Sequence, residues 1–138
     1  MPEGHTIHRL AADHSRDFAG QQLAVSSPQG RFADGARLLD GRLLSSVQAH
    51  GKHLLYDWDG HTLHVHLGLY GKFRRHQSPP PEPRGAVRLR VIGDRLAFDL
   101  NGPTACEILT TTEVRSLLDR LGVDPLRADA DPEKAWNR

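Results

Sequence analysis

Residues 52–69 read KHLLYDWDGHTLHVHLGL and carry a strong hairpin pattern. The pair Asp59-Gly60 separates two apolar runs, and an Asp-Gly pair in this setting is typical of a two-residue β-hairpin turn. On each side of the turn, apolar side chains recur at every second position, which is the period of a strand with one buried face. One face holds Leu54, Tyr56 and Trp58 before the turn and Leu63, Val65, Leu67 and Leu69 after it, while His64 and His66 point the other way.

The flanking sequence extends this hairpin into a mainly β domain. A second hairpin turns at Gly93-Asp94 between two further alternating runs. Residues 79–83 contain four prolines, which no central strand could tolerate, so we expect an exposed loop there. The predicted strands span residues 42–49, 52–58, 61–69, 70–76, 86–92, 95–100 and 104–109.

Helical patterns flank the β region. Residues 3–18 place apolar side chains on one helical face, and Gly20 follows where a helix would stop. A second helix begins at Thr110, which forms a capping box with Glu113, and it ends at Gly122. A third helix start is predicted at Asp131. The pattern predicts the α+β class, mainly β: a two-layer β-sandwich or flattened barrel flanked by two α-helices.

Composition limits the class of protein. The chain of 138 residues has one cysteine, Cys106, so neither a disulfide framework nor a cysteine-rich zinc site can be built from it. We expect a cytoplasmic protein, because the sequence shows no long apolar span and no basic-then-apolar leader. Residues 42–90 hold eight Lys or Arg against three Asp or Glu. Such a basic segment suits phosphate attraction, although a solvated sheet face explains it equally well.

The chain begins Met1-Pro2-Glu3. If an aminopeptidase removes Met1, Pro2 becomes a free secondary amine, and the pKa of a chain α-amine lies about 2 below that of lysine. An unprotonated amine can attack an aldehyde-like carbon and form a Schiff base, while a neighbouring carboxylate moves protons. A processed end without a chemical role is the alternative that this tripeptide leaves open.

Three stretches, taken in order, match a known family. Residues 1–9 read MPEGHTIHR, residues 51–55 read GKHLL, and residues 66–74 read HLGLYGKFR. Together they resemble the formamidopyrimidine-DNA glycosylase / endonuclease VIII family of base-excision repair enzymes. The resemblance covers the chain as the family's N-terminal catalytic domain, which we place at residues 1–124. It implies that residues 125–138 are a linker and the first helix start of a helix-two-turn-helix domain that is not in this chain.

The resemblance implies three catalytic residues. Pro2 would attack C1′ of the damaged nucleotide and displace the base, and elimination from the Schiff base would then break the backbone 3′ and 5′ of the lesion. Glu3 would protonate the deoxyribose ring oxygen and shuttle protons, beside a plainer role as a charge at a helix N-terminus. Lys52 stands where the family has a turn lysine that contacts the lesion's phosphate and tunes the Pro2 amine by like-charge repulsion. A solvated turn lysine is the alternative.

The same resemblance implies DNA contacts further along the chain. Leu69 and Tyr70 fall where endonuclease VIII-like members insert a wedge, because the space left by an everted base must be filled by apolar or aromatic atoms. Leu69 also shares the alternation of the buried set, so a core position competes for it. Lys72, Arg74 and Arg75 follow and could hold phosphates through salt-dependent contacts that carry no sequence information.

We expect no metal and no cofactor in this chain. His64 and His66 share a strand face, but a metal would need two further ligands, and His53 and His61 are not compelling candidates. Polar cross-strand packing is the preferred interpretation. The resemblance implies a structural zinc ion only in the C-terminal domain of the full-length protein.

Two departures from the family pattern bear on the substrate. Residues 99–105 lack the Arg-Phe insertion of formamidopyrimidine-type members, which, together with Gly4 and the Leu69–Tyr70 pair, favours an endonuclease VIII-like member. Gly68 departs from that type in turn, because endonuclease VIII typically has glutamine there. We interpret the full-length protein as a monomeric, endonuclease VIII-like DNA glycosylase and AP lyase that excises oxidised bases, pyrimidines favoured, from double-stranded DNA. The alternative is a non-catalytic module that binds damaged DNA. The isolated fragment should have weak repair activity or none, because in the family the absent domain supplies many of the contacts to DNA phosphates, and these contacts dominate affinity.

Overall fold

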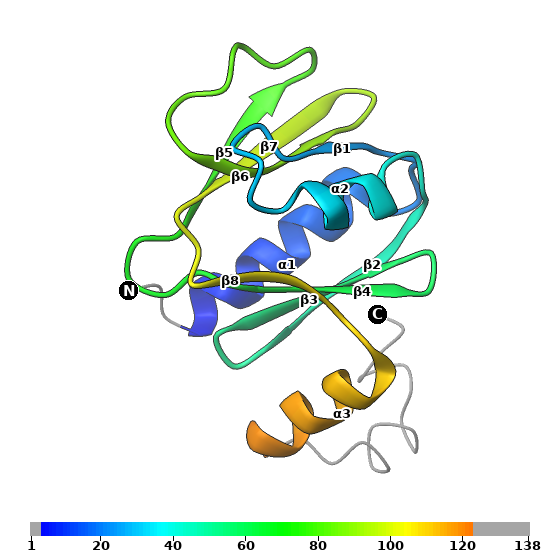
Figure 1. Ribbon diagram of the computed structural model, residues 1–138, viewed down its shortest axis with the longest axis vertical. Coiled ribbons are helices and arrows are strands. Elements are labelled where there is room, and N and C mark those ends of the chain that lie inside the picture. Colours follow the sequence, from blue (N-terminus) through cyan, green and yellow to red (C-terminus); the bar gives the residue numbers. More distant parts are fainter. Residues whose placement is uncertain (1–3, 123–138) are drawn as a thin grey trace.

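The computed structural model describes residues 4–122, which form three helices and eight strands (Figure 1). The predicted helix start at Asp131 and the predicted linker over residues 125–138 lie outside the described residues. The elements are α1 Gly4–Phe18, β1 Ala24–Ser26, α2 Ala33–Leu39, β2 Leu44–His50, β3 His53–Trp58, β4 His61–His66, β5 Lys72–Gln77, β6 Val87–Ile92, β7 Leu96–Asn101, β8 Ala105–Leu109 and α3 Thr111–Arg120.

The strands form two antiparallel sheets of four. The first sheet has the order β1-β6-β7-β5 and the second has the order β2-β3-β4-β8. The hairpin predicted from residues 52–69 is β3–β4, with His53 opposite His66 and Trp58 opposite His61. The predicted class is therefore confirmed as a two-sheet sandwich, in which the sheets stay open rather than closing into a barrel.

The prediction of two helices was wrong in number, since α2 is a third. This helix has seven residues and buries Ala36 and Leu39, but its N-cap residue, Phe32, makes no side-chain cap hydrogen bond. A helix this short shows little periodicity, and without a cap residue its start carries no sequence signal. The strand β1 was missed for a similar reason, because only one of its three residues, Val25, is buried.

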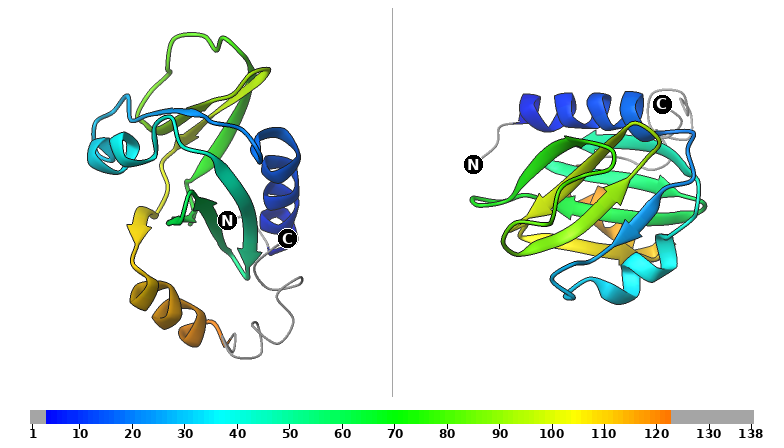
Figure 2. Two further views of the ribbon diagram at one scale, coloured as in Figure 1. Left: turned by 90° about the vertical axis from the view of Figure 1, so that its right-hand side faces the viewer. Right: turned by 90° about the horizontal axis from the view of Figure 1, so that it is seen from above.

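One hydrophobic core joins α1 to both sheets. Phe18 from α1, Tyr56 and Trp58 from β3 and Phe98 from β7 are each almost wholly buried in it. Figure 2 shows α1 running along one side of the two sheets, which closes that side of the core. Because buried side chains occur from Ile7 to Phe18, α1 packs on the sheets along its length, and this packing fixes the position of its first turn.

The helix α3 covers the outer face of the second sheet. Thr110 and Glu113 form the predicted capping box, in which the Thr110 Oγ1 accepts from the Glu113 N–H at 3.1 Å and the Glu113 Oε1 accepts from the Thr110 N–H at 2.8 Å. Leu117 and Leu118 of the helix pack against Leu55. The strand β3 is therefore buried on both faces, not on one. None of the helices in residues 4–122 is long and apolar enough to cross a membrane.

Candidate active site

The two residues predicted to carry the chemistry, Pro2 and Glu3, lie outside the described residues. The helix that follows them is described, and its direction is set by β2. Ser15 Oγ donates to the Val47 carbonyl oxygen at 3.3 Å, and the Gly20 N–H donates to the Leu44 carbonyl oxygen at 2.7 Å. Because α1 runs antiparallel to β2, its first turn lies at the end of β2 where the chain enters β3.

Three loops share that end of the second sheet. The register pairs His50 with His53, His53 with His66 and His66 with Ala105. The β2–β3 turn, the β4–β5 loop and the β7–β8 loop therefore all leave the sheet at the end where α1 begins. In Figure 1 these segments meet at the left-hand end of the second sheet, beside the blue start of α1.

Lys52 occupies the tip of the β2–β3 turn, as predicted. The preceding Gly51 has a φ of 61°, a left-handed conformation that a tight turn requires and that glycine adopts without strain. The Lys52 side chain is exposed. Its backbone carbonyl oxygen lies 3.2 Å from Nδ1 of His66, so the turn is fastened to the neighbouring strand β4. A cation is thus presented at the end of the sheet where α1 starts.

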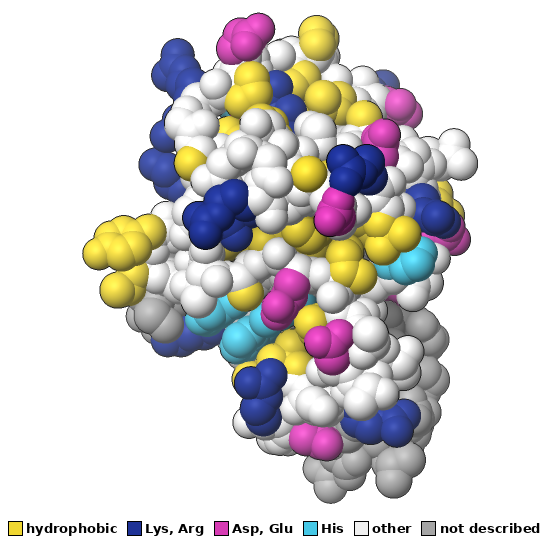
Figure 3. Space-filling model, in the orientation of Figure 1, with side chains coloured by type: hydrophobic (Ala, Val, Ile, Leu, Met, Phe, Trp, Pro, Cys, Tyr) yellow, Lys and Arg dark blue, Asp and Glu magenta, His cyan; other side chains and the backbone are white. Residues whose placement is uncertain are grey.

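Leu69 and Tyr70 project from the β4–β5 loop. Their side chains are 66% and 83% exposed, so the competing core position for Leu69 was wrong. The reason is that β4 ends at His66, and Gly68 with a φ of 66° turns the chain away after the buried Leu67. In Figure 3 the apolar atoms that protrude at the left lie over this loop. The geometry suits side chains that enter a gap in a partner.

The β7–β8 loop supports the exposed pair from behind. The Thr104 N–H donates to the carbonyl oxygen of His66 at 2.8 Å. Gly102 approaches the loop so closely that a Cβ there would lie 3.2 Å from the carbonyl oxygen of Tyr70. The Gly71 N–H closes the loop with a 3.0 Å hydrogen bond to the Leu67 carbonyl oxygen. The apolar projection is therefore braced by backbone contacts at both of its ends.

The three cations of β5 do not share one face. Lys72 and Arg74 are exposed on the outer face of the first sheet. Arg75 has the parity of Phe73, which packs on the core, and its Nε lies 3.3 Å from Oδ2 of Asp17 on α1. The structure thus keeps Lys72 and Arg74 together and separates Arg75 from them. This division follows from the two-residue period of the strand.

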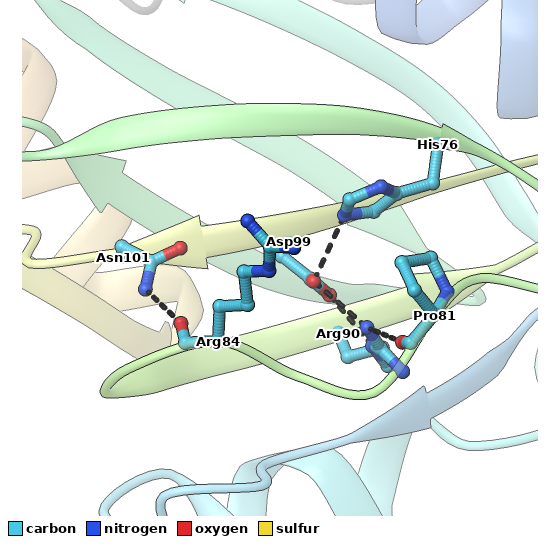
Figure 4. A network of polar contacts seen from close by, with 6 residues as sticks. All are labelled: His76, Pro81, Arg84, Arg90, Asp99 and Asn101. Carbon is cyan, nitrogen blue, oxygen red and sulfur yellow. Dashed lines mark hydrogen bonds and ion pairs between the residues drawn. The ribbon is translucent and has the colours of Figure 1, made fainter.

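A buried carboxylate organises the outer face of the first sheet near Arg74 (Figure 4). Asp99 accepts from Arg90 twice, at 2.7 Å from Nε and 2.9 Å from Nη2, and lies 3.1 Å from Nε2 of His76. Arg90 also donates to the Pro81 carbonyl oxygen at 2.7 Å. These contacts fasten the proline-rich loop over the sheet. Asp99 and Arg90 are only 2% and 8% exposed, so each neutralises the other's buried charge.

Sequence reasoning missed this pair, although a signal was present. In the predicted hairpin of β6 and β7, the apolar residues faced inward, which left Arg90 and Asp99 both facing outward. Their strands align them directly opposite one another. Opposite charges at facing positions of a predicted hairpin are the expected mark of a cross-strand ion pair.

Sequence reasoning also missed His14, which lies in the middle of the core. Its Nδ1 is 2.7 Å from the Tyr56 hydroxyl, and its ring stacks on Phe98 with centroids 4.5 Å apart. Burial lowers the pKa of His14 from 6.5 to about 4, although Asp13 and Asp17 act in the opposite sense. A neutral imidazole in the core has no access to a substrate, so we assign it a packing role. Its place one helical turn before Phe18, on the apolar stripe, was the available signal.

Within residues 4–122 the cysteine is unsuited to act as a nucleophile, and no metal centre is formed. Burial raises the pKa of the Cys106 thiol to about 12, so this thiol stays protonated. Within residues 4–122 no three His, Cys, Asp or Glu side chains come together as ligands for a metal ion. A four-cysteine zinc site does not fit this chain, which has a single cysteine.

Solved structures share the fold. The structure of MutM in complex with DNA containing carbocyclic 8-oxo-G matches with a TM-score of 0.73 and 18% identity, over 86% of this chain and 49% of that chain. Lactococcus lactis formamidopyrimidine-DNA glycosylase, bound non-covalently to DNA with an AP site, matches with a TM-score of 0.73 and 17% identity over 86% of this chain and 48% of its own. The two-sheet architecture is thus that of about half of a DNA glycosylase.

Sequence similarity carries the assignment further. A family profile described as the formamidopyrimidine-DNA glycosylase N-terminal domain matches residues 1–106. Endonuclease 8 1 of Mycobacterium tuberculosis is 53% identical over all of this chain and 53% of its own length. Formamidopyrimidine-DNA glycosylase of Methylococcus capsulatus is 33% identical over 91% of this chain and 49% of its own length. The chain belongs to the formamidopyrimidine-DNA glycosylase family and spans about half the length of these curated relatives.

Proposed function

We propose that the whole protein is a base-excision repair DNA glycosylase with AP lyase activity, acting on oxidised bases with pyrimidines favoured. One observation carries the proposal: the start of α1, the Lys52 turn and the exposed Leu69–Tyr70 pair share one end of the second sheet. A nucleophile ahead of α1 would therefore sit beside a phosphate-binding cation and beside a wedge that fills the gap of an everted base.

The chemistry begins at the N-terminus once Met1 is removed. The nitrogen lone pair of Pro2 attacks C1′ of the damaged nucleotide, and the base leaves with its glycosidic electron pair. The nitrogen then loses its proton, and its lone pair forms the C=N bond of an iminium as the ring bond from C1′ to oxygen breaks and Glu3 delivers a proton to that oxygen. The resulting iminium acidifies the C2′ proton. Loss of that proton expels the 3′ phosphate, and a second elimination expels the 5′ phosphate. Borohydride reduces the iminium and makes the adduct permanent.

The described residues contribute binding and charge. Lys52 holds the phosphate of the lesion, and its positive charge disfavours protonation of the nearby amine of Pro2. Leu69 and Tyr70 occupy the vacated position in the duplex, which offsets part of the cost of unstacking. Lys72 and Arg74 add phosphate contacts without sequence preference.

Borohydride trapping on an oligonucleotide with an abasic site tests the proposal. The full-length protein should form a covalent adduct. Pro2→Gly, which replaces the rigid secondary amine by a flexible primary amine, should slow adduct formation strongly while leaving DNA binding within about twofold, since the phosphate contacts are unchanged. Intact mass measurement must show that Met1 has been removed, because a retained Met1 acylates the nitrogen of Pro2. If the protein still traps after its terminal nitrogen has been acetylated, the assignment of the nucleophile is wrong.

A non-catalytic module that binds damaged DNA is the second candidate. The observation that favours it is that Lys52, Leu69 and Tyr70 are presented by the described fold whether or not the terminus is reactive. In that event the processed full-length protein binds abasic DNA tightly but never traps. The isolated chain should in either event bind weakly, because the relatives are about twice as long and phosphate contacts dominate affinity.

Further features belong to the same proposal. We place the protein in the cytoplasm. It acts as a monomer on double-stranded DNA and has no membrane partner. A structural zinc ion would belong to the second half of the full-length protein, because this chain lacks the cysteines to bind one. Metal analysis of the full-length protein, with and without residues beyond this chain, measures which half carries zinc.

A further inference from the structure

Four titratable side chains form a cluster on the outer face of the second sheet. His53 on β3 lies opposite His66 on β4, and His64 on β4 lies opposite Glu107 on β8. Because side chains two residues apart share a face, these cross-strand pairs bring all four groups together. The cluster adjoins the β2–β3 turn, which ends immediately before His53.

Hydrogen bonds link the four side chains to one another and to the β2–β3 turn. Glu107 Oε2 lies 2.8 Å from Nδ1 of His64, and an ionised carboxylate can only accept, so His64 donates from Nδ1. Nε2 of the same ring lies 2.8 Å from Nδ1 of His53, so a hydrogen bond joins His64 to His53. His66 donates from Nδ1 to the carbonyl oxygen of Lys52 at 3.2 Å.

Ring stacking connects the two halves of the cluster. The rings of His53 and His66 lie 4.4 Å apart and only 16° from parallel. His53 therefore touches His66 with its ring face while its edge is tied to His64 and, through it, to Glu107. A chain of contacts runs from the carboxylate of β8 to the backbone of the β2–β3 turn.

The stack requires a neutral imidazole at its centre. Burial, together with the neighbouring His66, His64, Arg120 and His50, lowers the pKa of His53 from 6.5 to about 4. A neutral His53 avoids charge repulsion against His66 while it keeps its hydrogen bond to His64. The hydrogen-bond pattern is thus stable at neutral pH.

A metal ion does not account for the cluster. A 2.8 Å hydrogen bond joins Nδ1 of His53 to Nε2 of His64, so neither nitrogen is open to a ligand. The remaining nitrogen of His64 is engaged by Glu107. The imidazoles serve as donors and acceptors for one another.

We propose that His53 is a positioning residue for the Lys52 turn: it holds the ring of His66 against the Lys52 carbonyl oxygen and is itself held by the His64–Glu107 pair. The role rests on the proposed function, in which Lys52 binds the phosphate of the lesion. The turn is short and the Lys52 side chain is exposed, so its backbone hydrogen bond to His66 limits where the cation can point. Lys52 acts on DNA, and His53 acts through Lys52.

A double-mutant cycle on the full-length protein tests this coupling, with the rate of borohydride trapping as the readout. His53→Ala should lower the rate about tenfold, as expected for a misplaced binding group. In the Lys52→Ala background the same substitution should change the rate less than about twofold, because the group through which it acts is gone. His53→Phe keeps a ring over His66 but loses the hydrogen bond to His64, so it should restore most of the lost rate.

His61→Ala is the matched control, since His61 lies at the other end of β4 opposite Trp58. It should leave trapping unchanged, and thermal unfolding should show that the His53 variants are folded. An equal loss in both Lys52 backgrounds, or no loss at all, overturns the positioning role while the proposed function stands. If the processed wild-type protein never traps, the proposed function fails and this role fails with it.

Discussion

The side chain of Thr104, on the β7–β8 loop, fills the space that a side chain at Gly68, on the β4–β5 loop, would need. A Cβ added to Gly68 would overlap Oγ1 of Thr104, and its φ of 66° already disfavours any side chain. The β4–β5 loop can therefore carry Leu69 and Tyr70 outward only with a glycine at its start, as long as Thr104 stands behind it. This contact gives a structural reason for glycine at position 68.

We expect Gly68→Ala to destabilise the protein more than Gly60→Ala. Both glycines have a positive φ, which costs a side chain about 1–2 kcal/mol, but a Cβ on Gly60 meets nothing within 4 Å. The excess should disappear when Gly68→Ala is combined with Thr104→Gly, which removes the overlapping atoms. Urea unfolding of the four variants measures the coupling energy, and strictly additive free energies of unfolding would show that the two residues do not compete.

The salt dependence of DNA binding should separate the cations of β5. Arg74→Ala should reduce the slope of log K against log salt concentration by about 1, the value for one lost phosphate contact. Arg75→Ala should reduce it less, because Arg75 already pairs with Asp17. Arg37→Ala on α2, where Arg37 pairs with Asp34, is the control and should leave the slope unchanged. Equal slopes for Arg74→Ala and Arg37→Ala would exclude Arg74 from the interface.

Asp99→Ala should be strongly destabilising. It leaves the buried guanidinium of Arg90 without its counter-charge, for which we expect a loss of about 3–5 kcal/mol. Asp34→Ala breaks the exposed pair with Arg37 and should cost no more than about 0.5 kcal/mol. Chemical denaturation compares the two directly. Similar losses for both would mean that the outer face of the first sheet is more hydrated than its burial indicates.

His14 should make the protein sensitive to acid. Its pKa is lowered on folding from 6.5 to about 4, so its contribution to stability is complete above pH 6.5 and is lost as the pH falls toward 4. The full effect is about 3 kcal/mol. His14→Phe keeps a ring beside Phe98 but cannot titrate, so its free energy of unfolding should fall less between pH 7 and pH 4. Parallel pH profiles for the two proteins would contradict the assignment.

Sequence reasoning succeeded where a pattern is local. Alternation on both sides of Asp59-Gly60 predicted the hairpin β3–β4, and the capping box at Thr110 predicted the start of α3. It failed where a residue's neighbours come from elsewhere in the chain. Arg75 looked equivalent to Arg74, but α1 supplies Asp17 to it, and no local pattern reports a partner that lies 58 residues away.

The amino-acid sequence alone determined the strand and helix pattern, the lysine at a tight turn and the motifs that place the chain in its family. These features depend on turn chemistry, on period and on residue identity, which neighbouring residues settle among themselves. Only the tertiary structure decided that Leu69 leaves the core, that His53 stacks between strands against His66, and that Arg90 and Asp99 neutralise one another. A two-residue period states which side chains share a face, but packing between sheets and loops decides what that face meets.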